Sequence, residues 1–167
     1  LREPVEAVAR AAAICVIGEG RMAPPAWAAG KPVLRFRRRV RGVAKLAAWR
    51  ESSGDELELE GIGPALEGRR VIAFCGLADP GGFHELLARR TPESLRLVAW
   101  SDHHRYSRAE QEHLRERADR EGAMLVTTEK DAVKLDPAAV GGDTLVVCIE
   151  LEEDDPAALD GLLDRLT

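Results

Sequence analysis

Short apolar runs alternate with helix-like segments through the second half of the chain. The runs are rich in Val, Leu, Ile and Ala, which is typical of strands buried in a parallel sheet, and they lie at 70–75, 95–100, 123–128 and 145–150. Helix-like segments separate or follow them at 82–89, 107–121 and 156–166. Strands that alternate with helices predict an α/β fold whose parallel strands are joined by right-handed crossovers. We therefore expect a parallel-sheet α/β/α domain over residues 63–167.

The segment 107–121 carries the clearest pattern for the start of a helix. Ser107 is a favourable N-cap residue, and Glu110, three positions later, completes a capping box. Leu114 and Ala118 lie one turn apart and supply an apolar side. The sequence therefore predicts a helix that begins directly after Ser107.

Charged residues alternate with apolar ones in the first half of the chain. A predicted strand at 33–40 follows a short apolar strand at 14–17 and places three basic residues on one face, namely Arg35, Arg37 and Arg39. The segment 56–60 places three acidic residues on one face in the same way, namely Glu56, Glu58 and Glu60. Opposite charges across a strand pair are favourable, so we expect these two segments to form a two-stranded antiparallel ribbon.

Composition limits the classes of function. The chain has 167 residues and a net charge of −5, which argues against a surface built for nucleic acid. No apolar run reaches the ~18 residues that a membrane-spanning helix needs. The three cysteines lie in apolar runs, and we expect them to be buried thiols in a reducing compartment: Cys15, Cys75 and Cys148.

Polar residues follow three of the predicted strands directly. The segments are 76–82, 101–104 and 127–131. Chemistry in open α/β sheets collects in loops at the carboxyl ends of strands, so we expect the three segments to converge at one edge. Residues 102–104 combine a carboxylate with two imidazoles, which suits proton relay or metal ligation. The alternative is a solvated turn.

The segment 127–131, Thr-Thr-Glu-Lys-Asp, offers two hydroxyls, two carboxylates and an amine. From these residues alone, the favoured interpretation is structural: Thr128 caps a short helix, its dipole favours Glu129 and Asp131, and Lys130 is solvated. The arginines at 35–41 suit a phosphate or an anionic membrane surface, but a solvated face balanced by acidic residues is the favoured interpretation.

Four segments, taken in order, resemble the tetraacyldisaccharide 4'-kinase family. They are Leu-Arg-Glu-Pro at 1–4, RVIAFCGLADP at 70–80, DHHRYS at 102–107 and LVTTEKDAVKL at 125–135. The family transfers the γ-phosphate of ATP to the 4'-hydroxyl of a tetraacylated glucosamine disaccharide, and its P-loop lies in an N-terminal domain. No GxxxxGK[ST] motif occurs in this chain, which also opens without Met. The resemblance therefore implies the C-terminal half of a longer kinase, inactive without the other half.

The resemblance also implies a domain division and roles for particular residues. Residues 1–30 would be the tail of the P-loop domain, 31–62 a two-stranded linker and 63–167 the C-terminal domain. Asp102, His103 and His104 would be catalytic, and Thr127, Thr128, Glu129, Lys130 and Asp131 would lie on the nucleotide side or support the catalytic groups. Glu3 would lie near Mg²⁺, and the arginines at 35, 37 and 39 would meet the membrane or the lipid phosphate.

The partners implied by the resemblance are ATP with Mg²⁺, an acylated disaccharide lipid, and the cytoplasmic side of the bacterial inner membrane. Two alternatives from other classes remain open on the residues alone. One is a metal-dependent phosphoesterase of the Asp-His-His type, although its usual additional Asp and His motifs are absent from the sequence. The other is an α/β binding module without catalytic activity.

Overall fold

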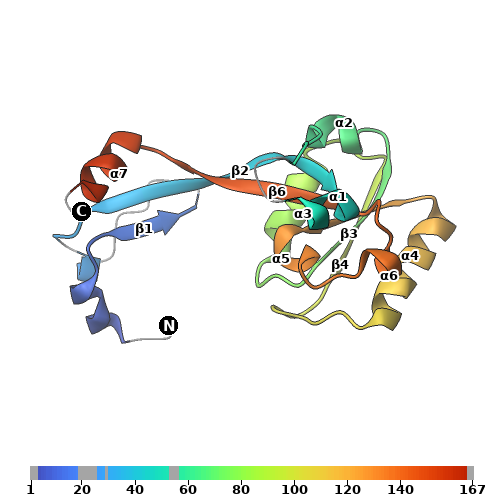
Figure 1. The fold of residues 1–167 in the computed structure, drawn as a ribbon, viewed down its shortest axis with the longest axis horizontal. Helices are drawn as coiled ribbons and strands as arrows, with labels where there is room; N and C mark the ends of the chain where they lie inside the picture. Colours follow the sequence, from blue (N-terminus) through green and yellow to red (C-terminus); the bar gives the residue numbers. More distant parts are fainter. Residues whose placement is uncertain (1–3, 19–25, 29, 53–56, 165–167) are drawn as a thin grey trace. The chain divides into compact units, whose positions relative to one another are not determined.

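The protein is described here by a computed structural model that covers residues 4–18, 26–28, 30–52 and 57–164 (Figure 1). The strands are β1 (Ile14–Ile17), β2 (Val33–Lys45), β3 (Arg70–Cys75), β4 (Ser94–Ala99), β5 (Met124–Thr128) and β6 (Leu145–Glu153). The α-helices are α1 (Leu46–Glu51), α2 (Ile62–Leu66), α3 (Pro80–Ala88), α4 (Arg108–Glu121), α5 (Glu129–Ala132), α6 (Pro137–Val140) and α7 (Pro156–Leu163). Two short 3₁₀ helices are η1 (Val5–Arg10) and η2 (Ala26–Ala28).

Six strands of the described chain form one sheet in the order β1-β2-β6-β5-β3-β4. The pairs β1–β2, β5–β6, β3–β5 and β3–β4 are parallel. The pair β2–β6 is antiparallel, since Arg37 contacts Asp154 while Arg39 contacts Glu152. The predicted α/β fold with a mostly parallel sheet is confirmed, and the predicted strands of the second half lie within two residues of their expected starts.

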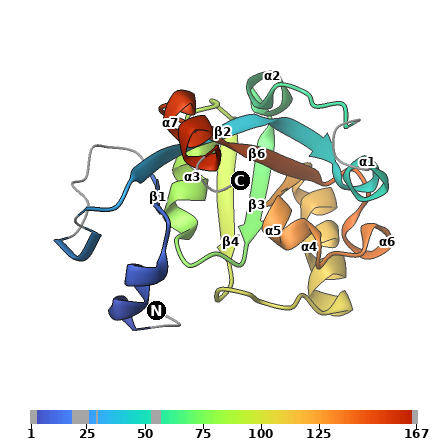
Figure 2. The same ribbon diagram turned by 60° about the vertical axis from the view of Figure 1, so that its left-hand side comes forward.

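The chain forms two compact units, one of residues 40–149 and one of residues 1–39 with 150–167. In the larger unit, β3 buries both of its faces. Ile72 and Phe74 pack into a cluster with residues from α1, α4, α5 and α6. Val71 and Ala73 pack on the opposite face with residues from α2 and α3. Helices therefore cover both faces of this part of the sheet, and α3 lies across β3 and β4 from α4 and α5 (Figure 2).

Helix α4 begins where the capping box predicts. The Ser107 hydroxyl accepts a hydrogen bond from the Glu110 backbone N–H at 3.2 Å, and the Glu110 carboxylate accepts from the Ser107 N–H at 2.7 Å. The helix ends at Gly122, whose φ of 59° is the left-handed conformation that favours glycine. Leu114 and Ala118 are buried, so the predicted apolar side faces the core.

The antiparallel partner of the arginine strand differs from the prediction. In the smaller unit, Arg37 pairs with Asp154 at 2.7 Å and Arg39 pairs with Glu152 at 3.1 Å. The partner strand of these arginines is therefore β6, and the expected pairing of the arginines with residues 56–60 is wrong; of the described residues 57–60, Glu60 alone pairs with β2, at Val43. The acidic residues at 150–155 supply the same charge complementarity, and β6 continues into them without a break.

The segment before α2 forms a single bridge where a strand was expected. Val43 and Glu60 exchange backbone hydrogen bonds of 2.8 and 2.9 Å, and no longer ladder joins the described residues 57–60 to β2. Glu56 lies outside the described residues. The cysteine prediction is confirmed for Cys75 and Cys148, which are buried, and wrong for Cys15, which is exposed on β1. In the described chain, no helix is both long and apolar enough to span a bilayer.

Candidate active site

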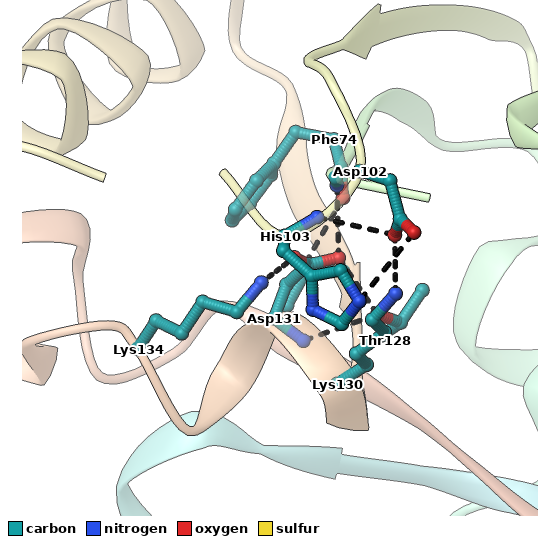
Figure 3. A network of polar contacts seen from close by, with 9 residues as sticks. Phe74, Asp102, His103, Thr128, Lys130, Asp131 and Lys134 are labelled. Atoms are coloured by element: carbon teal, nitrogen blue, oxygen red, sulfur yellow. Dashed lines mark hydrogen bonds and ion pairs between the residues drawn. The ribbon is translucent and has the colours of Figure 1, made fainter. Parts of the chain in front are cut away.

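The three polar loops after β3, β4 and β5 meet at one edge of the sheet, as the sequence predicts (Figure 3). The Gly76 N–H donates to the Asp131 carboxylate at 3.0 Å, which joins the first loop to the third. A Cβ atom at Gly76 would lie 3.2 Å from the Ser101 carbonyl oxygen and 3.3 Å from the His104 Cβ. Only glycine allows this close approach of the first loop to the second without displacing a neighbour.

Asp131 lies entirely inside the protein, with none of its surface exposed. Its carboxylate accepts hydrogen bonds from the Gly76 N–H at 3.0 Å, the Thr128 hydroxyl at 2.8 Å and the Lys134 ammonium at 2.9 Å. Burial acts to raise the pKa of Asp131, but the bonds from Lys134, Gly76 and Thr128 outweigh it and hold the pKa below its usual value. Asp131 is therefore an ionised buried carboxylate.

The other residues of this segment have largely structural contacts. The Thr128 hydroxyl caps α5 by accepting from the Asp131 N–H at 3.3 Å, which confirms the predicted cap. The Thr127 hydroxyl is buried and donates to the Phe74 carbonyl oxygen at 3.0 Å. The Glu129 carboxylate accepts from the Ile149 N–H at 3.0 Å. These contacts tie β5 and α5 to the neighbouring strands.

The Lys130 side chain is exposed, as expected, but it also has a partner within the protein. Its ammonium group forms an ion pair with the Asp102 carboxylate, which belongs to the loop after β4. This pair and the nearby His103 outweigh partial burial and hold the pKa of Asp102 below its usual value. The two residues are 28 positions apart, so no local pattern in the sequence could show that they meet. The general rule that loops converge at the carboxyl ends of parallel strands predicted that these two loops meet, but it could not identify the pair.

The two adjacent histidines occupy different environments. The His103 side chain is 73% exposed, and its Nε2 lies 3.5 Å from the Asp102 carboxylate. Its backbone φ is 61°, a left-handed conformation that is unusual for a residue with a Cβ. The His104 side chain is 22% exposed, its ring stacks on Trp100 at 5.4 Å, and its Nε2 lies 3.1 Å from Glu110. His103 is thus the imidazole that is open to solvent.

An aromatic cluster supports this loop, and the sequence analysis did not identify it. Tyr106 is buried and makes edge-to-face contacts with Phe74, Trp100 and His104 at centroid distances of 5.8, 5.2 and 5.0 Å. Burial, followed by the negative charge of Asp131, raises the pKa of Tyr106. The indication that the sequence offered for this cluster was the close spacing of Trp100, His104 and Tyr106 directly after β4.

The remaining candidate residues lie away from this cluster or outside the description. Arg37 and Arg39 belong to the smaller unit. Arg39 forms an ion pair with Glu152 near the end of β6, and Arg37 forms one with Asp154 directly after β6. Arg35 lies on the same strand. Glu3 lies outside the described residues. Within the described ranges, no three His, Cys, Asp or Glu side chains gather in a way that could hold a metal ion.

Comparison with known proteins identifies the family. The sequence profile of LpxK, tetraacyldisaccharide-1-P 4'-kinase, matches residues 1–167. The tetraacyldisaccharide 4'-kinase of Rhodopseudomonas palustris (strain BisB5) is 35% identical over 174 residues, which cover 99% of this chain and 46% of that protein. The tetraacyldisaccharide 4'-kinase of Methylobacterium nodulans is 39% identical over 155 residues, which cover 92% of this chain and 41% of that protein.

A solved structure has the same fold. The crystal structure of the "apo" form of LpxK from Aquifex aeolicus in complex with ATP matches with a TM-score of 0.58 and 22% identity, over 99% of this chain and 46% of that one. The chain thus spans less than half the length of the relatives that it matches. Since the family profile and these relatives match along almost all of its residues, the chain belongs to the tetraacyldisaccharide 4'-kinase family.

Proposed function

We propose that this chain is the C-terminal part of an ATP-dependent kinase that phosphorylates the 4'-hydroxyl of tetraacyldisaccharide 1-phosphate in lipid A biosynthesis. The observation that carries the proposal is the match to the kinase family along residues 1–167. The cluster of Asp102, His103 and Lys130 supports it, because this cluster presents an open imidazole beside two charged groups at the carboxyl ends of the strands. The phosphoesterase and the binding module lose their basis once the family is known.

His103 is the proposed proton-handling group of this chain. The 4'-hydroxyl must lose its proton as its oxygen attacks the γ-phosphorus of ATP. The ionised Asp102 faces His103 Nε2 and favours the tautomer that carries its proton there, which leaves Nδ1 as the acceptor. His103 would then assist a carboxylate base located outside this chain or orient the metal–phosphate complex.

Lys130 is the proposed group on the nucleotide side, and Thr128, whose hydroxyl is bonded to Asp131, would act by support. The Lys130 side chain is 38% exposed while its ammonium pairs with Asp102, so it can also reach a phosphate oxygen from the solvent side. Phosphoryl transfer concentrates negative charge on the transferred group, and a positioned cation stabilises that charge. Thr127, Glu129 and Asp131 direct their polar atoms to other parts of the protein and would act by support.

Mg²⁺ does not fit the described residues of this chain. The Asp102 carboxylate is occupied by Lys130 and the His103 backbone N–H, and Asp131 is enclosed by three donors. We propose that Mg²⁺ and the phosphates of ATP are held mainly by residues of the kinase outside this chain. Glu3 remains the candidate that the resemblance supplies.

Contact with the membrane is proposed for the arginine strand. Arg35, Arg37 and Arg39 lie along β2 and could meet an anionic lipid surface or the lipid phosphate on the cytoplasmic side of the inner membrane. The ion pairs of Arg37 and Arg39 with acidic residues reduce the positive charge that this surface offers. A peripheral association would therefore depend on other contacts as well.

The test compares the full-length protein with this chain. Purified full-length protein should phosphorylate the tetraacylated disaccharide with ATP and Mg²⁺, as measured by transfer of γ-³²P. The chain of residues 1–167 alone should not, because it has no P-loop motif to cradle the β- and γ-phosphates. Binding of either ligand without any phosphorylation by the full-length protein would favour the binding-module alternative. Phosphorylation by the isolated chain would contradict the assignment of the phosphate cradle to another part.

A further inference from the structure

Asp131 is a buried ionised group to which the proposed mechanism gives no contact with a substrate and no defined task. It has no exposed surface, so it cannot touch ATP or the lipid in this arrangement. An unpaired carboxylate in such a place would be strongly unfavourable, and Asp131 is satisfied by one ammonium, one hydroxyl and one backbone N–H. An enclosed charge with this many partners fixes the geometry of the groups that donate to it.

The donors to Asp131 come from separate segments of the chain. Gly76 lies in the loop after β3, Thr128 ends β5, and Lys134 follows α5. Gly76 also sits against the loop after β4, where a Cβ would meet Ser101 and His104 at 3.2 and 3.3 Å. The carboxylate therefore joins, directly or through Gly76, all three loops that form the candidate site.

Lys130, the residue before Asp131, connects the buried Asp131 carboxylate to the exposed side of the site. Lys130 immediately precedes Asp131 in α5, and its ammonium pairs with Asp102. Helix α5 has a single turn, from Glu129 to Ala132, and a helix this short has almost no stability of its own. The direction of the Lys130 side chain thus depends on what holds α5, and the Asp131 carboxylate supplies part of it, beside the bond between Glu129 and the Ile149 N–H.

We propose that Asp131 is a positioning residue of the kinase reaction, which ties the three loops together and holds Lys130 against Asp102. The inference rests on the proposed function and adds to it the residue that sets the geometry of the exposed groups. Asp131 itself touches no substrate. Its removal should act on kcat more than on the affinity for ATP, since misplacement of reacting groups by about 1 Å can lower a rate ~10²-fold.

The charged groups around Asp131 allow a test through pH. The titratable groups that face it are Lys134, which follows α5, Tyr106 in the loop before α4, and Cys75 at the end of β3. Lys134 is the cation among these groups, and its bond lowers the pKa of Asp131. With Lys134 replaced by Met, burial would be less opposed and the pKa of Asp131 would rise. The carboxylate would then take up a proton as the pH falls, and the anchor would fail.

The experiment uses full-length kinase with Asp131→Asn, Lys134→Met and the double variant. Asp131→Asn should lower kcat ~10–100-fold with KM for ATP changed less than about threefold, since the amide cannot accept from all three donors. Lys134→Met should have a smaller effect at pH 8 and should lose kcat at a higher pH than the wild type as the solution is acidified, while its circular dichroism stays constant. The double variant should be low at every pH, because no carboxylate remains to titrate.

Matched controls are Asp136→Asn and Lys45→Met. Asp136 caps α6, where Asn caps as well, and Lys45 is exposed at the end of β2. Wild-type kcat in Asp131→Asn, or a Lys134→Met profile that superimposes on wild type, would overturn the inference. So would a fall in Lys134→Met activity that tracks loss of folded protein. Should Asp131→Asn not fold, the Lys134→Met profile decides. An inactive wild-type enzyme would instead count against the proposed function.

Discussion

The loop cluster at the sheet edge and the arginine strand both pair opposite charges, but with different surroundings. The side chains of Asp102 and Lys130 are each 38% exposed, but Lys130 directly precedes Asp131, a carboxylate with no exposed surface and three donors. Arg37 and Asp154 are 55% and 40% exposed, and Arg39 and Glu152 are 62% and 45% exposed. Exposed pairs are screened by water and lose side-chain entropy, and under our proposal Asp131 offsets this loss for Lys130 by holding α5. We therefore expect substitutions of charged residues to alter catalysis in the loop cluster and to have little effect in the arginine strand.

The largest effect is expected from His103→Ala in the full-length enzyme. Loss of a positioned group that handles a proton lowers kcat ~10²–10⁴-fold, and KM for ATP should change far less. His104→Ala is the internal control, because its ring stacks on Trp100 and contacts Glu110. His104→Ala should lower the melting temperature, whereas its kcat should change little. A larger loss of kcat in His104→Ala would place the catalytic imidazole at the other position. Less than a tenfold change in both variants, with folded protein, would support the solvated-turn alternative.

Lys130→Met should have the next largest effect, roughly tenfold on kcat near neutral pH. Its ammonium keeps the pKa of Asp102 below the usual value. Without it the pKa of Asp102 rises toward that value, so Asp102 becomes protonated at a higher pH as the solution is acidified. The part of the kcat–pH profile that reports protonation of Asp102 should therefore move upward, toward pH 3.8. If this part of the profile is unchanged, Lys130 does not control the charge of Asp102, and Lys130→Arg should restore much of the wild-type profile.

Ser107→Ala should lower the free energy of unfolding by about 1 kcal/mol, because it removes the side-chain cap of α4. The Glu110 N–H would lose its bond to the hydroxyl, while the Ser107 backbone N–H could still donate to the Glu110 carboxylate. Urea denaturation of the full-length protein measures the loss, and Ser107→Thr is the matched control that keeps the hydroxyl. If Ser107→Ala destabilises the protein no more than replacement of Arg35, Arg37 and Arg39 with Gln does, the two regions do not differ in their contribution to stability.

The smallest effect on stability is expected from replacing Arg35, Arg37 and Arg39 together with Gln. Exposed ion pairs contribute ~0–1 kcal/mol each, so the melting temperature should change little. Binding to vesicles that contain anionic lipid should weaken clearly. A co-sedimentation assay at low and physiological salt measures this binding. If stability falls and vesicle binding does not, the strand has only a structural role.

Features encoded by neighbouring residues could be predicted from the sequence. The capping box of Ser107 and Glu110 is complete within four positions, and the structure has it as expected. The strand at 70–75 needs only its own apolar run. The convergence of the three loops followed from a general rule for parallel sheets, which applies whatever the side chains are.

Features that depend on distant partners could not be predicted. Two acidic stretches, 56–60 and 150–155, offered the arginines equally suitable charges, and charge alone does not choose between them. Arg39 and Glu152 are 113 positions apart, so their pairing depends on the path of the whole sheet. The ion pair of the exposed Lys130 could not be predicted for the same reason, since nothing near it in the sequence indicates Asp102. The burial of Asp131 likewise depends on Gly76, which is 55 positions away.

The left-handed backbone of His103 has a consequence for how the sequence can change under selection. A residue with a Cβ is less stable in this conformation by about 1 kcal/mol or more than glycine, and Asn is tolerated better than most residues. A library screened only for heat resistance should therefore accumulate Gly or Asn at position 103. A library screened for phosphorylated product should keep His. The position would separate the two lineages, because the change that relieves the backbone also discards the imidazole.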